Sequence, residues 1–62
     1  MYVIDLRVAS ELYNTNYCEM HGAGELKFET FFEAVDFFVE SIDDEYTNPQ
    51  NEVNFKQILR AV

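Results

Sequence analysis

The sequence predicts a small α+β domain spanning residues 1–62: a short N-terminal antiparallel sheet, a central acidic amphipathic helix and a C-terminal helix. Three observations predict it: a period of two in the first residues, a capping box before a helical pattern, and an Asn-Pro pair before a second one. A chain this short buries only about 60% of its unfolded surface, which leaves room for self-association or a partner to complete the core. With 48% hydrophobic residues we nevertheless expect it to fold, despite a net charge of −8.

The N-terminal sheet is predicted from alternation and from turn residues. Large apolar residues occupy every second position from 2 to 8, which predicts a strand with one buried face from residue 2 to about 10. The asparagine-rich stretch 12–16 predicts a turn, and residues 17–20 are interpreted as the returning strand. The two glycines within 21–24 indicate a flexible break, and residues 25–28 form another short extended piece.

The central helix has the best local signal in the chain. Thr30 and Glu33 have the spacing of a capping box, in which the threonine side chain accepts from the glutamate amide and the glutamate carboxylate accepts from the threonine amide. We expect a helix from there to about residue 44. Its spacing places six apolar residues on the buried side: Phe31, Ala34, Val35, Phe38, Val39 and Ile42.

The C-terminal segment has two interpretations. Asn48 is a good N-cap and Pro49 fits the first helical position, so a second helix is expected to begin there. Apolar residues at i, i+3, i+4 and i+7 from Phe55 continue that pattern to the end of the chain. The alternative is a final strand over residues 53–62, giving the order ββαβ, because periodicity alone does not separate the two at this length.

Negative charge is concentrated on the central helix. At about 100° per residue, six carboxylates fall within an arc of about 100°, opposite the apolar side. No Lys or Arg lies between residues 28 and 55. Like-charge neighbours on a helix cost about 0.2–0.5 kcal/mol per pair, so this arrangement opposes the helix that carries it. We call these residues the acidic rail: Glu29, Glu33, Asp36, Glu40, Asp43 and Asp44.

The acidic rail has two interpretations, a solvated helix face and a binding surface for a cationic partner. Two aromatic residues beside it, Phe37 and Tyr46, would add contact area to such an interface. Alternatively, Phe37 packs under the N-terminal strands. The partner-binding prediction therefore comprises the acidic rail together with Phe37 and Tyr46.

Composition excludes several classes of function. Twelve acidic residues against four basic ones argue against direct binding of nucleic acid or of an anionic membrane. Cys18 is the only cysteine, so no internal disulfide is expected and a cytoplasmic location is predicted. Asp5 and Arg7 interrupt the first apolar residues, which therefore suit neither a signal peptide nor a membrane span.

No catalytic or metal-binding signature is present in the sequence. Cys18 and His21 would supply half of a zinc site, but no further Cys or His exists to complete it. The glycine-centred calcium loop and the phosphate-binding and nucleophile motifs are also missing. We therefore predict a protein that is not an enzyme and that uses no metal or cofactor.

The first functional prediction is a small acidic inhibitor that occupies the basic, nucleic-acid-binding surface of a larger protein. No motif identifies a family. As a class, very small and strongly acidic single-domain proteins resemble the compact inhibitors that bacteriophages make against host polymerases, nucleases or defence complexes. The second prediction is a structural or assembly subunit, such as a homodimer, which works through an apolar surface: the N-terminal strand edge, or Phe32, Val39 and Phe55.

Overall fold

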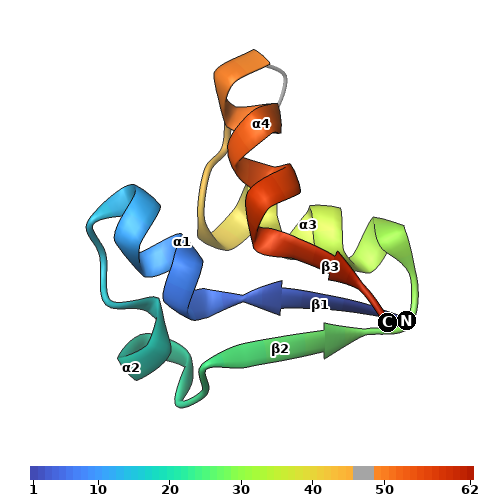
Figure 1. The fold of residues 1–62 in the computed structure, drawn as a ribbon, viewed down its shortest axis with the longest axis horizontal. Helices are drawn as coiled ribbons and strands as arrows, with labels where there is room; N and C mark the ends of the chain where they lie inside the picture. The colour runs from blue at the N-terminus through green and yellow to red at the C-terminus, as the bar shows by residue number, and fades with distance from the viewer. Residues whose placement is uncertain (46–48) are drawn as a thin grey trace.

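A computed structural model describes residues 1–45 and 49–62, which form a compact α+β domain (Figure 1). Its sheet has the strand order β2-β1-β3, in which β1 (Tyr2–Asp5) is central and both neighbours, β2 (Glu25–Phe28) and β3 (Leu59–Ala61), are antiparallel to it. The α+β class is therefore confirmed. The prediction of an entirely N-terminal sheet is wrong, because the C-terminal residues supply β3 and bring both chain ends together (Figure 1).

The predicted strand over residues 2–10 is too long. Only its first half is extended, and α1 (Leu6–Tyr13) follows at once. The Asp5 carboxylate accepts hydrogen bonds from the backbone amides of Arg7 at 3.0 Å and Val8 at 3.3 Å, which makes Asp5 the N-cap of a helix. The alternation of apolar residues continues to residue 8, so the pattern alone did not show that Asp5 caps a helix.

The returning strand predicted at residues 17–20 is also wrong, because this segment forms the short helix α2 (Tyr17–His21). Its N-cap is Asn16, whose side-chain oxygen accepts from the Glu19 amide at 3.1 Å. The turn predicted over residues 12–16 is confirmed only for residues 14–16, because α1 continues to Tyr13 and Asn14 ends it with a φ of 51°. Gly22 ends α2 with a φ of 67°, a conformation that glycine adopts without steric cost.

The central helix, α3 (Phe31–Ser41), is confirmed with its capping box, but it ends three residues earlier than predicted. The backbone amides of Ile42 and Asp43 both donate to the Phe38 carbonyl, each at 2.9 Å, and these bonds close the helix. Carboxylates beyond that point would face the negative end of the helix dipole, which is a physical reason for the early end.

Both interpretations of the C-terminal segment are partly right. Helix α4 (Pro49–Ile58) is followed directly by β3. The change of conformation allows Leu59 and Ala61 to pair with Ile4 and Tyr2 across the free side of β1. The predicted N-cap, Asn48, lies outside the described residues.

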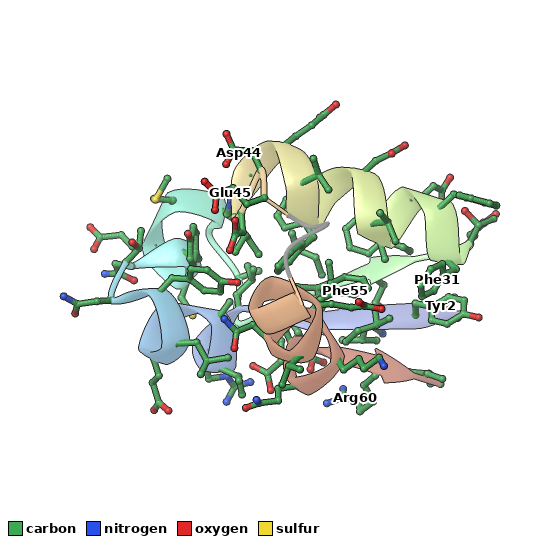
Figure 2. All side chains as sticks on the ribbon, turned by 90° about the horizontal axis from the view of Figure 1, so that it is seen from above. Tyr2, Phe31, Asp44, Glu45, Phe55 and Arg60 are labelled. Atoms are coloured by element: carbon green, nitrogen blue, oxygen red, sulfur yellow. The ribbon has the colours of Figure 1, made fainter. Side chains whose placement is uncertain are left out.

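One face of the sheet and the helices share a core. Ile4 of β1 packs with Phe38 of α3 and with Phe55 and Ile58 of α4, and each of these side chains is at most 2% exposed. The rings of Phe38 and Phe55 lie 4.8 Å apart. Figure 2 shows Phe55 in the space between α3 and α4.

The opposite face of the sheet has charged residues around one apolar residue. Val3 points away from the core because its neighbours Tyr2 and Ile4 point into it. It is nevertheless only 1% exposed. Its register partners are Lys27 and Arg60, and the Arg60 guanidinium reaches Glu25 on the far strand at 2.9 Å. We attribute the burial of Val3 to the long side chains of these cross-strand neighbours.

Candidate partner-binding surface

The acidic rail lies partly on α3 and partly beyond it. Glu33, Asp36 and Glu40 are exposed along the outer side of the helix, opposite the buried Ala34 and Phe38. The predicted single face over six carboxylates assumed a helix up to residue 44. Because α3 ends at Ser41, the other three are held by non-helical backbone: Glu29 before the helix, and Asp43 and Asp44 after it.

Glu33 also has a structural role at the start of the helix. Its Oε2 atom accepts from the backbone amides of Glu29 at 3.1 Å and Thr30 at 3.3 Å, while its own amide donates to the Thr30 hydroxyl at 3.2 Å. These bonds fix the position of one carboxylate of the acidic rail. Since Gln can make the same reciprocal contacts in a capping box, the charge and the cap can be separated by substitution.

Asp43 is less exposed than the other carboxylates of the acidic rail. It is half-buried, and its Oδ1 atom accepts from the Glu45 amide at 3.0 Å. Burial raises the pKa of Tyr13; the hydrogen bond from Asn54 lowers it, and the hydrogen bond to Asp43 and the charge of that carboxylate raise it further. Tyr13 therefore stays protonated and links α1 to Asp43 and to Asn54 of α4, whose amide donates to the hydroxyl at 3.3 Å.

Asp44 is exposed beside the end of α3, together with Glu45 (Figure 2). Phe37 is half-buried: its ring lies 5.1 Å from that of His21 and 5.5 Å from that of Phe28. This contact with β2 agrees with the alternative prediction, in which Phe37 packs under the N-terminal strands. Tyr46 lies outside the described residues.

Positive charge lies elsewhere on the molecule. Lys27 and Arg60 are on the outer face of the sheet, Lys56 is in the last turn of α4, and Arg7 lies at the start of α1 against Gly24. Within residues 1–45 and 49–62, none of the carboxylates displayed by α3 forms an ion pair with a base. The structure thus separates an acidic helix side from a mixed sheet face.

The apolar surface differs from the one considered in the sequence. Phe55 is 2% exposed, and β1 is the central strand, so neither can form an outer surface or a free edge. Phe32, by contrast, is 79% exposed, and Phe31 beside it is 41% exposed although its ring lies 5.7 Å from Tyr2. The free edges of the sheet belong to β2 and β3.

The Cys18 and His21 pair has packing partners. The Cys18 sulfur lies 4.0 Å from the Ser10 hydroxyl, and the His21 ring packs against Phe37. In the part of the chain that the structure describes, no three metal-ligating side chains gather. None of its helices combines the length and apolar character that a membrane crossing needs.

Comparisons with protein families, with curated proteins and with solved structures find no match to this chain. Its function must therefore be argued from the surface itself. The feature with the most definite chemistry is the outer side of α3, where exposed carboxylates follow one another without a neutralising base in the described residues.

Proposed function

We propose that this protein binds the basic, nucleic-acid-binding surface of a larger protein and thereby inhibits it. The observation that supports this proposal is the outer side of α3: Glu33, Asp36 and Glu40 are exposed there, and none is paired with a base of the described residues. Lysine and arginine side chains on a partner would form charge-assisted hydrogen bonds with them. Such charges chiefly set the rate and the orientation of encounter.

The spacing of these charges suits a site built for phosphates. With a rise of about 1.5 Å per residue, Glu33, Asp36 and Glu40 follow one another at about 5 Å along the helix axis. A single DNA strand carries one charge per about 3.4 Å, which is the same order. Glu29 and Asp44 extend the acidic rail at the two ends of the helix.

The proposed setting is the cytoplasm of a bacterium infected by a phage, where the target would be a host polymerase, nuclease or defence complex. This setting is proposed by analogy with the class of small acidic phage inhibitors. The balance of twelve acidic to four basic residues supports the analogy. No enzymatic step, metal or cofactor is part of the proposal.

A second candidate is an assembly subunit that self-associates as a homodimer. It is favoured by one observation, the exposure of Phe32 and Phe31 near the start of α3. A Phe32→Ser variant separates the two candidates, because it removes apolar contact area without changing any charge. We expect it to dissociate an apolar dimer, and to leave binding through the acidic rail unchanged.

The first experiment is a tagged pull-down from a bacterial lysate with washes in low and then high salt. We expect a nucleic-acid-binding protein to be retained at low salt and released by added DNA, because ion pairs at an exposed surface are screened by salt. Retention that is indifferent to salt and DNA, or recovery of the protein alone, would favour the assembly subunit.

The captured partner then permits a test with two sets of variants of equal charge. One set is Glu33→Gln, Asp36→Asn and Glu40→Gln, in which Gln keeps the cap. The control set is Glu11→Gln, Glu19→Gln and Glu52→Gln, on exposed residues of α1, α2 and α4. Three lost charge pairs of about 0.5–1 kcal/mol each predict at least about tenfold weaker binding for the first set. Equal losses in both sets, or no loss in either, would contradict the proposal.

A further inference from the structure

The edge of β2 offers free backbone hydrogen-bonding groups. The register pairs Ile4 with Leu26, and the Leu6 amide donates to the Gly24 carbonyl at 2.9 Å. Because bonded pairs alternate along an antiparallel ladder, the backbone groups of Leu26 face β1 and those of Glu25 and Lys27 point away from it. No described element lies along that outer side of β2 (Figure 1).

Aromatic rings adjoin this edge on the α3 side. Phe28 of β2 and Phe37 of α3 are both half-buried, with ring centroids 5.5 Å apart. On a helix with about 100° per residue, Glu33 lies about 40° and Glu40 about 60° from Phe37, further towards the outer side. Consider a side chain of an added strand that lies beside Phe28 on this face of the sheet. Its stem would pack on the aromatic rings, and its end would reach the carboxylates of Glu33 and Glu40.

We propose that an extended segment with arginine at alternate positions adds to β2 as a fourth, antiparallel strand. This inference rests on the proposed function and specifies the part of the partner that is bound. Arginine suits the site because its aliphatic stem and planar guanidinium pack on aromatic rings while its charged end reaches carboxylates. Main-chain bonds to Glu25 and Lys27 supply the second attachment, as in other cases of strand addition.

The other free edge fits such a segment less well. Strand β3 has three residues, against four in β2. Its one charged residue is Arg60, whereas β2 carries Glu25 as well as Lys27. The helix α3 with its exposed carboxylates adjoins β2 through the contact between Phe28 and Phe37. We therefore expect an arginine-containing segment to prefer β2.

The probe is a nine-residue peptide that alternates Thr and Arg, titrated into the isotopically labelled protein while the amide resonances of Glu25 and Lys27 are followed by NMR. Opposite residues of an antiparallel pair have side chains on the same face, so the peptide residues that bond to Glu25 and Lys27 are the threonines. We expect N-methylation of the threonine amides to weaken binding at least about tenfold, and N-methylation of the arginine amides to change it little. Charge and composition are identical in the two peptides.

A protein variant gives an independent test. Lys27→Pro removes an amide that points outward and so deletes no bond to β1, whereas Lys27→Thr removes the same charge and keeps the amide. We expect the proline variant to bind the Thr-Arg peptide at least about tenfold more weakly than the threonine variant. The methylated peptides use the unaltered protein, so the test holds even if the proline variant fails to fold.

Failure of this inference is distinguishable from failure of the proposed function. Equal binding of the two methylated peptides, or no binding of the Thr-Arg peptide at about 1 mM, overturns strand addition. The proposed function still stands in that case if the acidic-rail variants lose the captured partner. A dimer that Lys27→Pro dissociates would show that a second copy occupies the edge, and would also overturn the inference.

Discussion

Two charged surfaces of this domain are built differently. On the outer face of the sheet, Glu25, Lys27 and Arg60 mix both signs and surround Val3, which is only 1% exposed. On the outer side of α3, Glu33, Asp36 and Glu40 have one sign, and none is paired with a base of the described residues. The sheet face contains an ion pair between Glu25 and Arg60, whereas the α3 carboxylates form none with a base of the described residues.

The difference shows which charges serve the fold. The sheet charges shield an apolar residue with their stems and join two strands that are not neighbours. The charges of α3 repel one another, as Asp36 and Glu40 stand four residues apart, and each such pair costs about 0.2–0.5 kcal/mol. Glu33 offsets this cost through its capping bonds, whereas Asp36 and Glu40 form no ion pair with a base of the described residues. This difference supports the proposed role of Asp36 and Glu40 in partner binding.

The largest loss of stability is expected from a substitution of Val3, which lies among the charged residues of the sheet. Val3→Ala removes two buried methyl groups and should lower the free energy of unfolding by roughly 2 kcal/mol. Phe32→Ala is the control on the helix, and since its side chain is 79% exposed we expect a change within about 0.5 kcal/mol. Urea denaturation measures both. Equal losses of unfolding free energy in the two variants would show that the burial of Val3 on the outer sheet face does not stabilise the fold.

A smaller effect is expected at the cap that holds the acidic side of α3 in place. Thr30→Ala removes the acceptor for the Glu33 amide and should lower the free energy of unfolding by about 1 kcal/mol. Thr30→Ser keeps the hydroxyl and serves as the control. Urea denaturation of this pair, followed by circular dichroism, gives the comparison; if the two variants unfold alike, the capping box does not determine where α3 begins.

The elements that the sequence predicted well are those fixed by local chemistry. The capping box and the spacing of Ala34 and Phe38 depend only on residues 30–38, and both were found as expected. Strand β3 depends on pairing between residues 2–4 and 59–61, at opposite ends of the chain, which no local pattern contains. The alternation over residues 2–10 failed at Asp5, because a carboxylate that caps a helix has the same place in the pattern as a polar residue of a strand.

The same distinction applies to the candidate site. Helical periodicity correctly placed Glu33, Asp36 and Glu40 on the exposed side. It did not show that Asp43 is half-buried near Tyr13, because that contact joins α1 to the residues after α3. The open edge of β2 was also missed, since it exists only because β3 and β2 both pair with β1.

The contrast between the two surfaces can be tested by reversing one charge on the acidic rail. Glu40→Lys replaces a repulsive pair with Asp36 by an attractive one and puts a cation near the end of α3, where the helix dipole favours it. Glu11→Lys is the control: it changes the net charge equally, from −8 to −6, but introduces repulsion with Arg7 four residues earlier.

The decisive measurement records unfolding and partner binding for these two variants under the same conditions. Relative to the control, we expect Glu40→Lys to unfold with a free energy higher by about 0.5–1 kcal/mol, and to bind the captured partner several-fold more weakly. Unchanged binding by Glu40→Lys, or an equal loss for Glu11→Lys, would contradict the assignment of the acidic rail as the binding surface.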